Sequence, residues 1–179
     1  MDLTRLEKLE WVVVNLEEIC KSYFISRAIN LESRNLDAGF EVYAPYRHLC
    51  NVLVTDFVIR WCKVFGTNSE EMHWKNFVPE ADLEAFKASI YASANASPEE
   101  FHAYWQQMKA ARDTACAHFT YEYVDKEMPL FEIALDSASA AHSYFVDQLI
   151  RLGVKRSHFD FKQFGETSSI GFMHKVGKG

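Results

Sequence analysis

The segment "RDTACAH" (112–118) places an arginine, an aspartate and a histidine within two turns of a predicted helix. Histidine titrates near neutral pH and can give or take a proton. Arginine stays charged and binds anionic oxygens as a fork. These residue types suit acid–base chemistry on an anionic substrate, so we take Arg112, Asp113 and His118 as the candidate catalytic residues.

The positions of these side chains on a helix decide how they act together. The apolar residues before the segment follow helical spacing, and His118 lies at the end of that stripe. Arg112 is turned about 120° from His118 and lies about 9 Å along the axis. One copy therefore cannot easily close both groups on one atom, whereas a twofold homodimer brings two of each around a shared cleft. The small residues at 110–117 permit the close helix approach that this requires.

A second interpretation of the same residues needs no site. Small side chains also serve packing inside one chain, and Lys109 and Asp113 form an i, i+4 pair. His118 then simply ends a buried stripe. The residues alone leave both interpretations open.

Five helices account for most of the chain. They are expected at 3–29, 46–65, 79–92, 97–119 and 129–152. Thr4 with Glu7 forms a capping box, and Ser97, Pro98 and two acids begin the fourth helix. Residues 30–45 are expected as a polar connection, and residues 154–179 show no helical period. The fold class is an all-α, up-and-down bundle of about five helices.

Charge divides the chain into a helical domain (1–153) and a basic C-terminal tail (154–179). Residues 151–179 carry six cations against two anions, a local charge of +4. Because the net charge is −6, the first 150 residues carry −10. The acidic body argues against a broad nucleic-acid-binding surface. The tail has three expected partners, which are RNA, an acidic protein or the body itself, and the alternative is a solvated end without a partner.

Composition points to a globular protein with a bulky core, since 49% of the residues are hydrophobic and 14 are Phe. The longest apolar runs are too short to span a bilayer, and the N-terminus lacks the apolar region of a secretory signal. We therefore expect a cytoplasmic protein without membrane association. The four cysteines are far apart and are expected as buried thiols.

The remaining histidines do not combine into a recognisable metal or cofactor site. Glu70–His73 and Glu99–His102 match the E-x-x-H pattern of di-iron bundles, but their placement in a loop and in a first helical turn is wrong for it. His48 has no assigned role, and His142 is expected to pack between helices or lie at a solvent edge. We expect no metal and no cofactor.

The run R-D-x4-H on a penultimate long helix resembles the R-polar-x4-H signature of HEPN-domain proteins. The order "WCKVFG" (61–66), "HW" (73–74), "RDTACAHF" (112–119) and an alanine-rich closing helix is similar to the abortive-infection, AbiU-like branch of that superfamily. The similarity covers roughly residues 46–150.

The resemblance implies a HEPN-like bundle that dimerises through its motif-bearing helices. It also implies a metal-independent endoribonuclease of a phage-defence or toxin–antitoxin module, with RNA as substrate and an antitoxin protein as partner. Carried onto this chain, His118 is the acid/base, Arg112 stabilises the phosphate, and Asp113 orients one of them. Members that only bind exist, so the alternative is a non-catalytic helical module that binds a protein partner or a nucleotide.

Overall fold

The computed structural model describes residues 3–35, 40–117 and 128–176. Within these ranges the chain forms six α-helices and no strand, which confirms the all-α class and adds one helix to the expected five. The helices are α1 (Arg5–Asn35), α2 (Phe40–Phe65), α3 (Leu83–Ser93), α4 (Pro98–Ala111), α5 (Phe131–Arg151) and α6 (Phe161–Val176). Two 3₁₀ turns, η1 (Trp74–Asn76) and η2 (Glu80–Asp82), precede α3, and a π-helical segment, η3 (Arg112–Ala117), follows α4. None of the described helices combines the length and apolar character needed to cross a bilayer.

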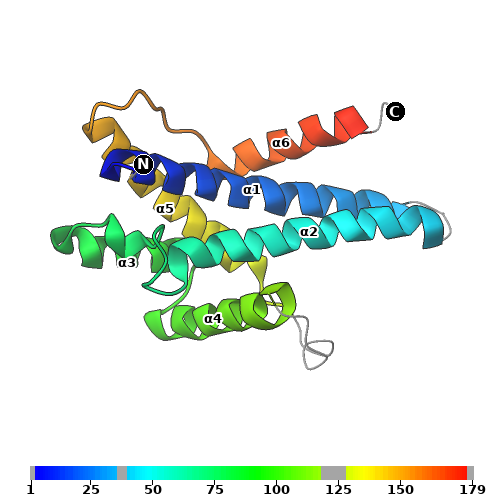
Figure 1. Cartoon of the computed structure of the whole chain (residues 1–179), viewed down its shortest axis with the longest axis horizontal. Coiled ribbons are helices and arrows are strands. Elements are labelled where there is room, and N and C mark those ends of the chain that lie inside the picture. The colour runs from blue at the N-terminus through cyan, green and yellow to red at the C-terminus, as the bar shows by residue number, and fades with distance from the viewer. Residues whose placement is uncertain (1–2, 36–39, 118–127, 177–179) are drawn as a thin grey trace.

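The two longest helices, α1 and α2, lie side by side along most of the molecule (Figure 1). The predicted capping box begins α1: Glu7 N donates to Thr4 Oγ1 (3.3 Å), and Thr4 N donates to Glu7 Oε2 (2.7 Å). One face of α1 is fully buried against α2, α5 and α6, since Val12, Val13, Leu16 and Ile19 have no exposed surface. The helix α1 therefore carries much of the core.

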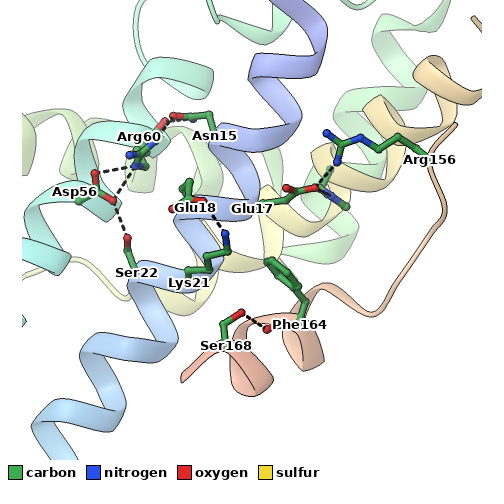
Figure 2. A network of polar contacts seen from close by, with 11 residues as sticks. Asn15, Glu17, Glu18, Lys21, Ser22, Asp56, Arg60, Arg156, Phe164 and Ser168 are labelled. Carbon is green, nitrogen blue, oxygen red and sulfur yellow. Dashed lines mark hydrogen bonds and ion pairs between the residues drawn. The ribbon is translucent and has the colours of Figure 1, made fainter. Parts of the chain in front are cut away.

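A polar network holds α1 and α2 in register (Figure 2). Asp56 accepts hydrogen bonds from Ser22 Oγ (2.7 Å) and from Arg60 Nε (2.7 and 2.8 Å). Arg60 reaches back to Asn15, whose Nδ2 donates to the Arg60 carbonyl (3.1 Å). Because the partly buried polar atoms find these partners at one alignment of the two helices, sliding one helix would leave them unpaired.

The connection expected at 30–45 is largely helical, so that prediction was wrong outside residues 36–39, which are not described. The helix α1 continues to Asn35, and α2 begins at Phe40 with Pro45 inside it. Proline lacks the N–H that would bond to the carbonyl of Glu41, so the helix crosses Pro45 at the loss of one backbone hydrogen bond. Packing of α2 against α1 outweighs that local preference.

The core between α2, α4 and α5 is aromatic, as the composition predicts. Trp61 is fully buried and donates its indole N–H to Ser137 Oγ at 3.0 Å. Its ring stacks on Phe65 with centroids 5.0 Å apart and meets the edge of Tyr104 at 5.9 Å. The hydrogen bond satisfies the polar end of a large apolar side chain, so Trp61 fills the centre without an orphaned donor.

The fourth helix begins as predicted and ends earlier. Ser97 Oγ accepts from Glu100 N (3.2 Å), the Glu100 carboxylate accepts from Ser97 N (2.8 Å), and Pro98 opens the helix. The expected continuation as one regular helix to Phe119 is wrong, because the α-helix ends at Ala111 and the backbone becomes π-helical over Arg112–Ala117. Two helices follow this element, so it is not the penultimate one.

The expectation of no helix after residue 153 is also wrong. The helix α6 spans Phe161–Val176 and packs along α1 (Figure 1). Asp160 begins it, because its side chain accepts from Gln163 N at 2.9 Å. Gly165 is buried at the crossing, where a Cβ would lie 2.3 Å from the Phe24 ring and 2.6 Å from Cys20 Sγ. Glycine therefore permits a contact too close for any other residue.

Three basic residues near the start of the C-terminal segment pair with the acidic body. Arg156 Nη1 donates to Glu17 on α1 (2.8 Å; Figure 2), and on α5 His158 lies 2.9 Å from Asp147 and Lys162 lies 2.6 Å from Asp136. Of the three partners expected for the tail, its own body therefore engages these residues.

Candidate functional site

Two of the three predicted catalytic residues lie together at the end of α4. Arg112 and Asp113 open the segment η3, and Asp113 Oδ1 lies 2.7 Å from both Nε and Nη2 of Arg112. The arginine side chain is 21% exposed and the aspartate 54%, so the pair lies at the surface with the guanidinium partly covered. Arg112 thus keeps a fixed direction and remains accessible to an anion.

The backbone around this pair departs from regular helix. A π-helical segment replaces the α-helical hydrogen bonds by i→i+5 bonds, a conformation that is rare and concentrated at functional sites. The Thr114 hydroxyl donates to the carbonyl of Ala110 at 2.6 Å, which gives one carbonyl at the junction a partner. The change of winding falls on the segment that carries the candidate residues.

His118, the predicted acid/base, lies outside the described residues, as does the geometry that relates it to Arg112 and Asp113. The side chains from Ala115 onward to residue 127 are likewise not described. The predicted role of His118 therefore stays a prediction.

Electrostatics hold Arg112 in its charged form. The hydrogen bond to Asp113 raises the pKa of the Arg112 guanidinium, and the charge of Asp113 adds to this, while partial burial acts in the opposite direction. The carboxylate of Glu70 contributes in the same sense as Asp113. Arg112 is thus a permanent cation whose charge is partly balanced locally, a state suited to reversible anion binding.

The α4 surface leading to Arg112 carries two aromatic rings followed by two cations. His102, Trp105, Lys109 and Arg112 follow one another at intervals of three, four and three residues, which places them on one face of the helix. The His102 ring stacks on the Trp105 indole (5.3 Å, 23°), and Lys109 Nζ lies 4.2 Å from the centroid of the same indole. We call these four residues the α4 face.

The contacts on the α4 face show that one sequence prediction was wrong. They also show a row of aromatic and basic side chains that was not predicted. Lys109 and Asp113 do not form the predicted i, i+4 pair, because Asp113 bonds to Arg112 and Lys109 lies over Trp105. A cation over an indole face is attracted by the ring quadrupole and competes with an exposed ion pair. The helical spacing of these four residues could have predicted the α4 face. The four residues lie beside the buried apolar stripe of the same helix, on which the prediction was based.

Two buried histidines, His73 and His142, have local structural roles. His73 is buried, caps η1 by accepting from Lys75 N at its Nδ1 (3.2 Å), and burial lowers its pKa to about 4. His142 is buried between Phe159 and Phe161, with ring centroids 4.9 Å from each, so it packs between elements. His48 is exposed on α2.

No group of three or more His, Cys, Asp or Glu side chains in the described ranges converges as metal ligands would. Neither Glu70–His73 nor Glu99–His102 contributes to such a group. Among the described cysteines, Cys20 and Cys62 are buried as expected, whereas Cys50 is only half-buried, so the expectation is wrong there.

No family model, curated protein or solved structure matches this chain. The chemistry of the site is therefore argued from its own residues.

Proposed function

We propose that the chain is a HEPN-like, metal-independent endoribonuclease. The observation that supports this most is the Arg112–Asp113 pair, held at the surface on a π-helical segment at the end of a face that also carries Trp105 and Lys109. A guanidinium of fixed direction binds a phosphate through two parallel hydrogen bonds. The flanking aromatic and basic side chains suit a polyanion with planar bases.

The proposed reaction is transesterification within the RNA chain. A base removes the proton of a 2′-hydroxyl, whose oxygen forms a bond to the adjacent phosphorus while the bond to the 5′-oxygen breaks and an acid protonates that oxygen. The products are a 2′,3′-cyclic phosphate and a 5′-hydroxyl. His118 is the proposed acid/base, Arg112 stabilises the charge of the phosphorane-like transition state, and Asp113 orients Arg112.

The proposal includes a homodimer, because the HEPN resemblance implies two copies that meet through their motif-bearing helices. Two copies that meet through their α4 elements bring the imidazole of one near the guanidinium of the other. The proposed partner is an antitoxin protein that covers this interface between the two copies.

Purified protein incubated with single-stranded RNA in EDTA tests the proposal. We expect fragments that end in 2′,3′-cyclic phosphate, and a loss of about a hundredfold or more in rate for Arg112→Ala and for His118→Ala. Gln107→Ala, an exposed position on the same helix, is the matched control and should cleave like the wild type. Cleavage that survives both substitutions, or no cleavage together with normal growth on overexpression, contradicts the nuclease.

The alternative function, a non-catalytic module that binds a nucleotide, draws on the same α4 face, because stacking and phosphate binding need no acid or base. It predicts RNA binding that depends on Arg112 without fragments, and His118→Ala then leaves binding unchanged.

A further inference from the structure

A pocket of about 190 Å³ opens beside the α4 face. Its aromatic walls come from α4, from the turn η1 and from α3: Trp105, His102, Phe101, Trp74, His73 and Tyr91. The volume is below the roughly 300 Å³ at which pockets accept drug-sized ligands, so it admits one planar ring system and leaves the rest of a ligand outside. In the sequence, His73 and His102 belong to two separate E-x-x-H patterns. The fold brings both side chains to this pocket.

We propose that this pocket binds one base of a single-stranded RNA whose phosphates lie along Lys109 and Arg112. The inference rests on the proposed function, because it assigns a subsite to the RNA that the site cleaves.

The wall formed by Trp105 is held in place before any ligand arrives. Its indole N–H donates to the carbonyls of Phe65 (2.6 Å) and Gly66 (3.2 Å) at the end of α2. Gly66 itself is constrained, because a Cβ there would lie 2.2 Å from the Cys62 carbonyl oxygen. A preorganised aromatic surface loses little entropy when a base stacks on it, and such stacking tolerates any base because every base has an aromatic face.

The pocket also offers a hydrogen-bond donor for the edge of a base. The Nδ1 atom of His73 accepts from Lys75 N, so the neutral ring carries its proton on Nε2. Nε2 has no hydrogen-bond partner among the described residues, and His73 lines the pocket. An N–H in this position matches the ring nitrogens and carbonyl oxygens that nucleobases present.

Charge selects the class of ligand. Lys75 lines the pocket, Lys109 Nζ lies 4.2 Å from the centroid of the Trp105 ring, and Arg112 follows at the end of the α4 face. Lys109 and Arg112 are roughly 6 and 10 Å along the helix axis from Trp105. Three cations disfavour the quaternary ammonium ligands that aromatic pockets often take and favour an anion attached to the ring. A polynucleotide supplies both the ring and a row of phosphates.

The test is an equilibrium titration with a short 2′-O-methyl oligoadenylate, which has no free 2′-hydroxyl and cannot be cleaved. An abasic oligomer of the same length and charge is the comparison probe. We expect the wild type to bind the oligoadenylate about tenfold or more tightly than the abasic oligomer, with quenching of tryptophan fluorescence.

Substitutions separate the contribution of base binding in the pocket from that of phosphate binding by the cations. His102→Ala, at an exposed position, should remove most of the preference for the oligoadenylate and leave the affinity for the abasic oligomer unchanged. Arg112→Ala should weaken both probes alike, and Gln107→Ala should change neither. A melting curve for each variant confirms that it is folded.

Equal affinity of the wild type for the two probes, or a preference that His102→Ala leaves intact, overturns the inference. Displacement of the oligoadenylate by AMP at equal concentration overturns RNA as the ligand. Because the probe cannot be cleaved, these results are independent of the nuclease assay: a preference without cleavage refutes the proposed catalysis alone, and cleavage without a preference refutes the base subsite alone.

Discussion

Asp113 Oδ1 lies 2.7 Å from two nitrogens of Arg112, so the carboxylate both aims the guanidinium and offsets its charge. Aiming Arg112 favours both RNA binding and catalysis, whereas the negative charge of Asp113 weakens the binding of a polyanion. Replacing Asp113 separates them.

Asp113→Asn should bind uncleavable RNA more tightly and cleave RNA more slowly. The amide removes a negative charge from the path of the phosphates and holds Arg112 less firmly. We expect a rate loss of up to about a hundredfold, the scale of a small misplacement of a catalytic group. Single-turnover cleavage and fluorescence anisotropy measure the two quantities. Weaker binding by Asp113→Asn would contradict the charge argument.

Gly165→Ala should detach or strain α6. The added methyl would meet the Phe24 ring and Cys20 Sγ at 2.3 and 2.6 Å, and overpacking of this kind costs about 1–3 kcal/mol of unfolding free energy. Urea denaturation measures the change. Gly171→Ala is the matched control on the same helix, because its Cβ meets nothing within 4 Å. That substitution should stabilise by about 0.4–1 kcal/mol through the lower entropy of the unfolded chain. A similar effect at both glycines would refute the close crossing of α6 over α1.

His73 should make the protein less stable as the pH falls from 6.5 toward 4. Burial lowers the pKa of the folded-state imidazole to about 4, whereas the unfolded chain takes up the proton near 6.5. The unfolded state therefore binds more protons in this window, and stability falls with decreasing pH by at most about 1.4 kcal/mol per unit from this group. His73→Asn keeps an acceptor for Lys75 N and should flatten the pH dependence. His102→Ala, at an exposed histidine, should not. Urea midpoints at pH 7 and pH 5 provide the measurement.

Glu17 should contribute stability that disappears in acid. Burial raises the pKa of its carboxyl, but His142, whose Nε2 lies 3.5 Å from Glu17 Oε1, and the charge of Arg156 together outweigh burial, so the folded-state pKa lies below 4.5. The contribution is complete above the unfolded-state pKa and is lost as the pH falls through the lower folded value.

Glu17→Gln should therefore cost about 1–3 kcal/mol at neutral pH, because Arg156 and the buried His142 lose their anion. The difference from the wild type should shrink below pH 4.5. Glu18→Gln breaks a half-exposed pair with Lys21 and should cost less than about 1 kcal/mol. Equal losses for the two variants, from thermal unfolding at several pH values, would argue against Glu17 as an anchor of the C-terminal segment.

The sequence correctly predicted the starts of α1 and α4, where all the capping residues lie within one helical turn. Thr4 with Glu7 and Ser97 with Glu100 each place a hydroxyl and a carboxylate three residues apart, and both capping boxes form. The helix α2 ends at Phe65, as predicted. These features depend on neighbours within one helical turn, so the sequence contains all that is needed to predict them.

The errors came where distant contacts outweigh local preference. Pro45 suggested a boundary that packing against α1 overrides. Residues 154–179 show no helical period, so no helix was expected there, although Asp160 can cap one. The winding change at Arg112 has no pattern in the sequence that we can name.

By itself, the sequence determined the all-α class, the approximate helix segments and the Arg112–Asp113 neighbourhood, because apolar periodicity and capping act over a few residues. Only the tertiary structure decided that the C-terminal segment docks through Glu17, and that His73 and His102 line one pocket. Those pairings join residues far apart in the chain. Their closeness depends on how whole helices pack, and the spacing of residues within one helix does not reveal it.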